Sequence, residues 1–270
     1  MAVTTLIADS AVVAKRNLIK IKRVPALIVF TTLSPMMFVV LFAYVFGGAI
    51  DPATGGAAYR EFLIPGIFTQ TIIFGTITTG AGLAEDVTKG IVDRFRSLPM
   101  APSAVLAGRT LSDVVNNAIA LAVMAVTGLI VGWRVRGSFL DALWAFTLLL
   151  IFAYAASWVM ALLGLLIPSP EVIGSAPYLG IFPLTSFANT FVPPATMPTP
   201  LRVFAEWNPI SAVTQAARDL FGNADPDPTV PVSTAWPLEH PQLYTLLWAV
   251  AIVAVFAPLA SRQYRRAATR

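Results

Sequence analysis

The stretch that decides the fold is Glu85-Asp-Val-Thr-Lys-Gly-Ile-Val-Asp-Arg-Phe-Arg-Ser-Leu-Pro99, a strongly charged run between two long apolar segments. The apolar segments cover residues 62–84 and 110–132, and the only charged residue in them is Asp113. A helix needs about twenty mostly apolar residues to cross the hydrocarbon core of a bilayer. Both segments are therefore predicted to span a membrane, and the charged run between them is predicted to lie at the membrane surface.

The charged run has a helical pattern of its own. Its apolar residues recur at helical spacing on one face, and these are Val87, Ile91, Phe95 and Leu98. Its charged residues fall on the opposite face, and these are Asp86, Lys89, Asp93 and Arg96. This pattern predicts a short amphipathic helix over residues 85–99, stopped by Pro99. A helix held between two spans is suited to docking onto a partner outside the membrane.

The composition indicates an all-α membrane protein with little soluble mass. Of the 270 residues, 57% are hydrophobic and only 12% are charged, whereas soluble domains carry about 25% charged residues. The chain has no cysteine and a single histidine, His240, which excludes disulfides and argues against a metal site. It also has no glycine-rich phosphate-binding motif, so we expect no catalytic residue, no metal and no cofactor in this chain.

Six segments are apolar and long enough to be spans of a single transmembrane domain covering residues 1–270. They cover residues 24–46, 62–84, 110–132, 139–167, 172–192 and 242–261. Pro177 and Pro183 interrupt the fifth segment, which makes it a kinked helix that needs neighbours to satisfy its freed carbonyl groups.

The distribution of basic residues predicts the orientation. Most of them stand before the first span, in the loop between the second and third spans, and after the last span: Lys15, Arg16, Lys20, Lys22, Arg23, Lys89, Arg94, Arg96, Arg109, Arg262, Arg265, Arg266 and Arg270. Loops rich in lysine and arginine stay in the cytoplasm. Both termini and the charged run are therefore expected on the cytoplasmic side, and the charge excess does not indicate nucleic-acid binding.

Two further segments show amphipathic patterns. Residues 1–23 place apolar and basic side chains on opposite helical faces, which predicts an interfacial helix, although a basic tail that serves only topology is the alternative. Residues 193–241 form the long outer segment, with two short helical patterns separated by Asn208 and Pro209. We expect these two helices to lie on the outer leaflet or to dip into it.

Several residues of the charged run leave alternatives open. Arg94 lies at the edge of the apolar face, so it either contacts a docked partner or reaches lipid headgroups. Asp86 and Asp93 are docking residues or simply belong to a solvated face, and Asp86 also fits the start of a helix, where acids are favourable. Gly90 either permits a close backbone approach or is a weak helix position.

Asp113 lies about one turn inside the third span, four residues after Arg109. An acid within a span is a functional candidate by default. An i, i+4 pair with Arg109 would neutralise it near the interface without any further role. A structural pair and a role toward a proton or a substrate both remain open.

Several motifs of the chain resemble one known family. They are Lys89-Gly-Ile-Val-Asp-Arg-Phe-Arg-Ser-Leu-Pro-Met100, Gly108-Arg-Thr-Leu-Ser-Asp113, Tyr59-Arg-Glu-Phe-Leu-Ile-Pro-Gly66, Phe191-Val-Pro-Pro194, Met197-Pro198, Glu206-Trp-Asn-Pro209, Pro258-Leu-Ala260 and Tyr264-Arg-Arg266. In this order and spacing, the chain resembles the permeases of ABC-2 type transporters, and within them the daunorubicin-resistance-like exporter branch.

The resemblance implies a six-span subunit of the bacterial inner membrane, with both termini inside, that exports a hydrophobic or amphipathic drug, antibiotic or lipid. It implies pairing with a second copy or a homologous permease, and with two copies of a separate ATPase that binds ATP and Mg. Residues 85–99 would be the coupling helix, with contacts from Asp86, Val87, Gly90, Ile91, Asp93, Arg94, Phe95, Arg96 and Leu98. Residues 1–23 would be the elbow helix, and residues 193–241 a hairpin that closes the exit.

Two other classes of function compete with this one. A membrane-embedded enzyme would need paired acids, a histidine cluster or an activated nucleophile, and Asp113 stands alone in its span. An ion-coupled carrier would carry several ionisable residues in its spans, and inverted repeats. Neither pattern is found in the sequence, and no substrate-binding residue can be assigned from it.

Overall fold

The computed structural model describes residue 33 and residues 35–46, 56–91, 102–167, 169–223 and 233–267. Within these ranges all regular secondary structure is helical. The elements are η1 (Leu41–Phe46), α4 (Ala57–Gly75), α5 (Ile77–Thr88), α7 (Pro102–Val131), α8 (Phe139–Leu166), α9 (Pro170–Ser186), η2 (Pro194–Thr196), α10 (Thr199–Trp207), α11 (Pro209–Phe221), α12 (Trp236–Glu239) and α13 (Pro241–Ala267). The expected elbow helix, residues 1–23, lies outside the described residues.

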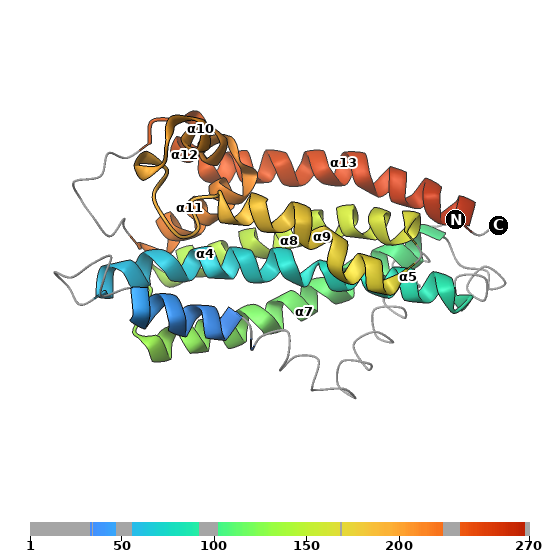
Figure 1. The fold of residues 1–270 in the computed structure, drawn as a ribbon, viewed down its shortest axis with the longest axis horizontal. Coiled ribbons are helices and arrows are strands. Elements are labelled where there is room, and N and C mark those ends of the chain that lie inside the picture. Colours follow the sequence, from blue (N-terminus) through green and yellow to red (C-terminus); the bar gives the residue numbers. More distant parts are fainter. Residues whose placement is uncertain are drawn as a thin grey trace.

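The long helices run side by side along the long axis of the molecule (Figure 1). At one end, which we call the loop end, lie the last turns of α5 and α13. At the other end, the hairpin end, α10, α11 and α12 gather beside the turn between α7 and α8. The two ends carry different polar clusters, and each cluster contains a largely buried arginine.

Four helical stretches of the described chain are long and apolar enough to cross a membrane: Ala57–Thr88, Leu106–Val131, Phe139–Leu166 and Pro241–Arg266. They coincide with the second, third, fourth and sixth spans expected from the sequence. The first of them joins α4 and α5 through Thr76, whose φ and ψ are helical. The chain is therefore a multi-pass helical membrane protein.

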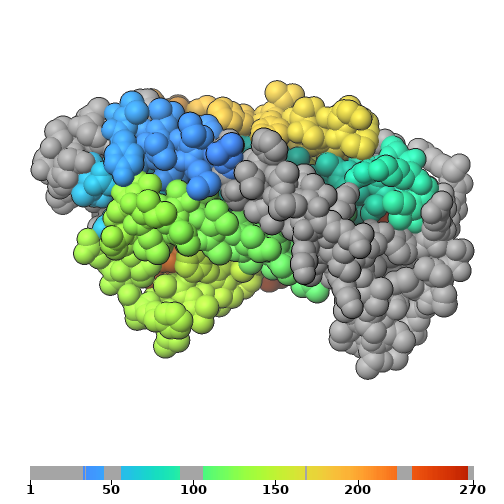
Figure 2. Space-filling model, turned by 90° about the horizontal axis from the view of Figure 1, so that it is seen from below, coloured from blue at the N-terminus to red at the C-terminus, as the bar shows by residue number. Residues whose placement is uncertain are grey.

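The first and fifth expected spans differ from these four. Of residues 24–46, the structure describes only part, including a short apolar helix, Pro35–Val45, that lies beside α4 and α7 (Figures 1 and 2). The expected span over 172–192 corresponds to α9, which has 17 residues and ends at Ser186. Just beyond the helix, the backbone N–H of Asn189 donates to Ser211, and the carbonyls of Asn189 and Thr190 accept from Arg218, so this stretch is bonded to side chains of α11.

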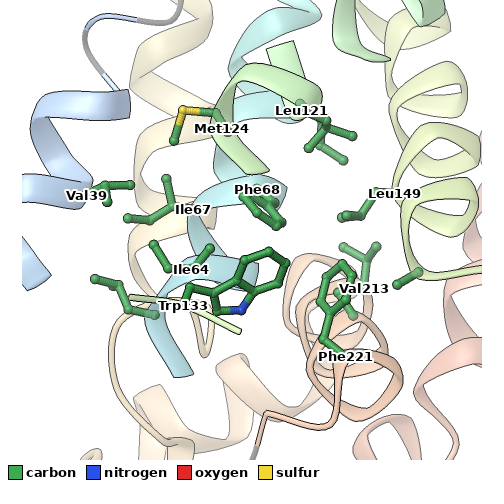
Figure 3. Close-up of a cluster of buried hydrophobic side chains, with 14 of the residues drawn as sticks. Val39, Ile64, Ile67, Phe68, Leu121, Met124, Trp133, Leu149, Val213 and Phe221 are labelled. Carbon is green, nitrogen blue, oxygen red and sulfur yellow. The ribbon is translucent and has the colours of Figure 1, made fainter. Parts of the chain in front are cut away.

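An aromatic cluster fills the core near the hairpin end (Figure 3). The rings of Phe68, Trp133 and Phe221 meet edge to face, with centroids 5.1 to 6.0 Å apart, a favourable arrangement of their quadrupoles. Phe221 comes from α11, which packs against α4, α8 and α13. The outer segment thus forms two helices joined at Asn208, as expected, but α11 is buried in the bundle.

The expected amphipathic helix over 85–99 has a different boundary in the structure. Residues 85–88 are the last turn of α5, which ends at Thr88. Gly90 has a φ of 64°, a left-handed conformation that glycine adopts without strain and that ends a helix. Ile91 is helical again, and residues 92–101 lie outside the described residues. Val87 and Ile91 are therefore separated by a turn and do not belong to one continuous helix.

Candidate coupling site

Arg109 is the centre of a polar cluster at the loop end. Its Nη1 lies 3.8 Å from Oδ2 of Asp86 on α5, and its Nε lies 3.9 Å from Oδ2 of Asp113 on its own helix, α7. Its Nη2 donates a hydrogen bond to the backbone carbonyl of Thr78, at 3.1 Å. The side chains of Arg109, Asp86 and Asp113 are 14%, 15% and 4% exposed. One cation thus joins α5 and α7 through two carboxylates and a carbonyl group.

Gly82 makes room for this arginine. A Cβ atom at position 82 would lie 1.6 Å from Nη2 of Arg109, so no larger residue fits there while the guanidinium keeps its place. About two helical turns before Gly82, a Cβ at Gly75 would lie 2.3 Å from Oδ1 of Asn117. Small residues let helices approach closely in membranes. Here Gly75 at the end of α4 and Gly82 on α5 also leave space for polar side chains of α7.

Asp113 has a second partner across the helix boundary. The hydroxyl of Thr79 on α5 donates to Oδ2 of Asp113, at 2.6 Å, and both side chains are buried. The sequence predicted an i, i+4 contact with Arg109 and left the role of the acid open. The structure adds the hydrogen bond from α5, which means that Asp113 connects two helices in addition to balancing a charge.

Asp86 lies in the last turn of α5, so the interpretation of it as an acid at the start of a helix is corrected. An acid at a helix C-terminus is unfavourable toward the helix dipole, and the nearby guanidinium of Arg109 offsets this cost. Because Asp86 and Thr79 belong to α5 and Asp113 belongs to α7, the cluster ties together the two helices that flank the loop. The same cation therefore contacts both helices.

The remaining expected coupling residues divide into two groups. Val87 packs on a small apolar cluster that includes Leu83, Leu106 and Tyr264, while Gly90 and Ile91 follow it at the loop end, partly exposed. The others lie outside the described residues: Asp93, Arg94, Phe95, Arg96 and Leu98. Val87 thus belongs to the packing of the bundle, which its helical spacing alone did not indicate.

Lys89 and Glu85 form an exposed ion pair one helical turn apart. The hydrogen bond to Glu85 and the charge of its carboxylate raise the pKa of Lys89. Exposed pairs of this kind contribute little to stability. Lys89 therefore remains a solvated cation, and it offers a control position next to the cluster.

The sequence interpretation did not single out Arg218, which is 1% exposed on α11. A signal was present, because Arg218 follows Ile210, Val213, Ala217 and their neighbours in a helix with few charges. An arginine in such a helix must find partners when the helix is buried.

No group of three or more histidine, aspartate or glutamate side chains that could hold a metal ion occurs in the described part of the chain. Two polar arrangements in this part link helices to one another: the cluster around Arg109 and one face of α11. Both arrangements consist of hydrogen bonds and ion pairs between helices. Such contacts can hold helices together or release them.

The chain matches the family description "ABC-2 type transporter" over residues 10–221. It is 34% identical to the daunorubicin resistance ABC transporter permease protein DrrB1 of Streptomyces coeruleorubidus over 250 residues, which cover 93% of this chain and 83% of the relative. It is 29% identical to the doxorubicin resistance ABC transporter permease protein DrrB of Mycobacterium tuberculosis over 239 residues, 85% of this chain and 80% of the relative.

A more distant relative is the putative transport permease ycf38 of Porphyra purpurea, 22% identical over 223 residues that cover 82% of this chain and 76% of the relative. The family match spans well over half of the chain and includes both helices of the Arg109 cluster. The helical fold, the apolar spans and these matches agree with one another, and the chain belongs to the ABC-2 type transporter family of membrane permeases.

Proposed function

We propose that this chain is the permease subunit of an ABC exporter that moves a hydrophobic or amphipathic compound out of the cell. The observation that carries the proposal is the 34% identity with a permease named for daunorubicin resistance, over 93% of this chain. A second relative is named for doxorubicin resistance. Both names point to amphipathic drugs, and a lipid of similar character belongs to the same chemical class.

The energy for export would come from a separate ATPase, present in two copies and holding ATP and Mg. The chain has no glycine-rich phosphate-binding motif. Residues 85–99, which begin with the last turn of α5 and precede α7, are the segment best suited to contact the ATPase. Asp86 and Arg109 then stand directly behind that contact, where they link its movement to both flanking helices.

The loop end would face the cytoplasm of a bacterial inner membrane, and the hairpin end the outside. The last turn of α13 adds Arg265 and Arg266 to the basic residues of the loop end, which agrees with the tendency of basic loops to stay inside. A second copy of this chain, or a homologous permease, would complete the pathway, and lipids would cover the remaining apolar surface.

A charge reversal in the loop tests this proposal. Phe95→Asp places a charge on the face expected to dock, and Arg94→Glu reverses the charge at its edge; either a desolvated charge or a lost contact costs several kcal/mol. We expect both variants to insert at normal levels and to lose export. Less ATPase should copurify with them than with the unmodified chain. Lys89→Gln is the matched control, because its ion pair is exposed, and it should export normally.

Two results would contradict the proposal. Normal export by a variant carrying both Arg94→Glu and Phe95→Asp would show that this loop does not transmit the motion of an ATPase. Hydrolysis of ATP by the purified chain, free of other ATPases, would show that the energy does not come from a separate subunit.

A further inference from the structure

One face of α11 is polar although the helix is buried. Asn208, Ser211, Gln215 and Arg218 follow one another at spacings of three, four and three residues, which places them in a single row along the helix. Asn208, Ser211 and Arg218 are at most 3% exposed. On other sides of the same helix, Val213, Ala217 and Phe221 belong to the apolar core.

Each residue of this row binds the segment where α9 ends. The amide of Asn208 donates to the carbonyl of Leu184, at 2.8 Å. The hydroxyl of Ser211 accepts from the backbone N–H of Asn189, at 3.0 Å, and Gln215 accepts from the side-chain amide of the same Asn189, at 3.1 Å. Three successive turns of α11 thus hold one short stretch of chain, residues 184–190.

Arg218 completes the row. Its Nη2 donates to the carbonyls of Asn189 and Thr190, at 2.7 and 3.1 Å, and its Nε donates to the carbonyl of Phe62 on α4, at 2.8 Å. Its guanidinium carbon lies 3.5 Å from the centre of the Phe62 ring, a cation–π contact. A positive charge after the end of α9 is also favourable toward the dipole of that helix.

The rest of α9 is only loosely embedded. Along its 17 residues only Ile173 and Thr185 are buried. Near the loop end, Ile173 packs with Ile77 and Ala84 of α5, and the ring of Tyr178 stacks on that of Phe74 at 5.2 Å. The helix is thus attached to the second span at one end and to α11 at the other, with mostly exposed side chains between.

The polar contacts of α11 with the end of α9 differ in kind from the apolar contacts of α11 with the core. Hydrogen bonds to backbone groups can be exchanged for bonds to water at small net cost where an opening admits water, whereas the apolar packing of α11 on the core has no such replacement. A movement of α5 that pulls on α9 would therefore separate α9 from α11 at the polar row and leave α11 in the core. α5 is also the helix whose last turn carries Asp86 of the Arg109 cluster.

We propose that Asn208, Ser211, Gln215 and Arg218 form a releasable latch, which holds the end of α9 in this structure and lets go of it when the hairpin end opens during transport. These four are positioning residues, since each of them bonds groups of the protein itself. The inference rests on the proposed export function.

A reversible crosslink tests the latch. Because the chain has no cysteine, Ser211→Cys with Asn189→Cys gives a protein whose only two thiols lie at the latch, where they can be joined by oxidation or by a short bis-thiol reagent. In membranes that also contain the ATPase, we expect the reduced protein to export, the crosslinked protein to lose export, and reductant to restore it. Equal export by the crosslinked and reduced forms would overturn the latch.

Failure of the proposed function gives a different result, because the reduced protein itself would then show no ATP-dependent export. A second measurement needs no crosslink. Ser211→Cys alone should react with an impermeant thiol reagent from outside faster while the transporter is cycling than at rest. Thr214→Cys is the matched control: Thr214 is equally buried on the same helix, and its hydroxyl bonds only the carbonyl of Ile210. Equal rates at rest and during cycling for position 211 would contradict the latch.

Discussion

The two ends of the bundle each bury an arginine, but they balance its charge differently. Arg109 lies near two carboxylates, those of Asp86 and Asp113. Arg218 donates to three backbone carbonyls and lies over the ring of Phe62. Carboxylate side chains can rotate with the cation that they face, whereas backbone carbonyls keep the places that the chain gives them. The Arg109 cluster therefore tolerates rearrangement, whereas the Arg218 contacts require one particular path of the backbone.

This difference fits the positions of the two sites. The Arg109 cluster adjoins a loop that is expected to move with a partner, and a cation with two acids can follow such movement without leaving a charge unpaired. Arg218 holds the segment after α9 only while that segment keeps its present course. The first arrangement is suited to transmitting a displacement, and the second to defining one state.

The largest effect is expected from Arg218→Met. The substitution keeps much of the volume but leaves three carbonyls without this donor, and it should lower the free energy of unfolding by about 3 kcal/mol. Thermal unfolding in detergent, followed by the loss of the monodisperse peak in size-exclusion chromatography, measures the change. Arg202→Met on α10 is the control, since Arg202 is exposed. Similar unfolding temperatures for the two variants would show that the carbonyl contacts contribute little.

Arg109→Met should have a smaller effect, about 1–2 kcal/mol, because Asp113 keeps the hydrogen bond from Thr79. Adding Asp113→Asn should recover part of the loss, since it removes the acid that the arginine balanced. The same unfolding assay on the single and double variants gives their coupling energy. Additive losses would show that Arg109 and Asp113 do not act as a pair.

The smallest effect is expected from Gly82→Ala. The new methyl group meets the end of a flexible side chain, Arg109, and not backbone, so the guanidinium should move aside at a cost of about 1 kcal/mol. Gly174→Ala on α9 is the control. No atom lies within 4 Å of the added Cβ there, and the change should be neutral or stabilising. A loss at position 82 as large as that of Arg218→Met would show that the Arg109 cluster is rigid.

The sequence predicted most of the spans because their signal is local. Residues 62–84, 110–132, 139–167 and 242–261 are continuous apolar runs, and length alone identifies them. The neighbourhood of Arg109 and Asp113 was also visible, because the two residues are one helical turn apart on the same helix. The link to Asp86 was not visible, since it depends on how α5 and α7 pack.

Other features could not be predicted because a local pattern had two outcomes. Gly90 was consistent with a helix position and with a left-handed turn, and only the structure shows its φ of 64°. The helical spacing of the apolar residues on α11 suggested an amphipathic helix at the membrane surface. The buried partners of its polar face come from residues 184–190 and from Phe62, which are distant in sequence. The pattern alone therefore could not distinguish a polar face in contact with water from one that is hydrogen-bonded inside the bundle.

The burial of α11 has a consequence for how the protein assembles. With 13 residues, the helix is about 20 Å long, too short to cross a bilayer by itself. Yet its Phe221 completes the aromatic cluster with Phe68 and Trp133, which are made much earlier in synthesis. Until residues 209–221 arrive, the helices before them have an unfilled core, so during biogenesis the growing chain passes through a loosely packed stage that depends on its last third to close.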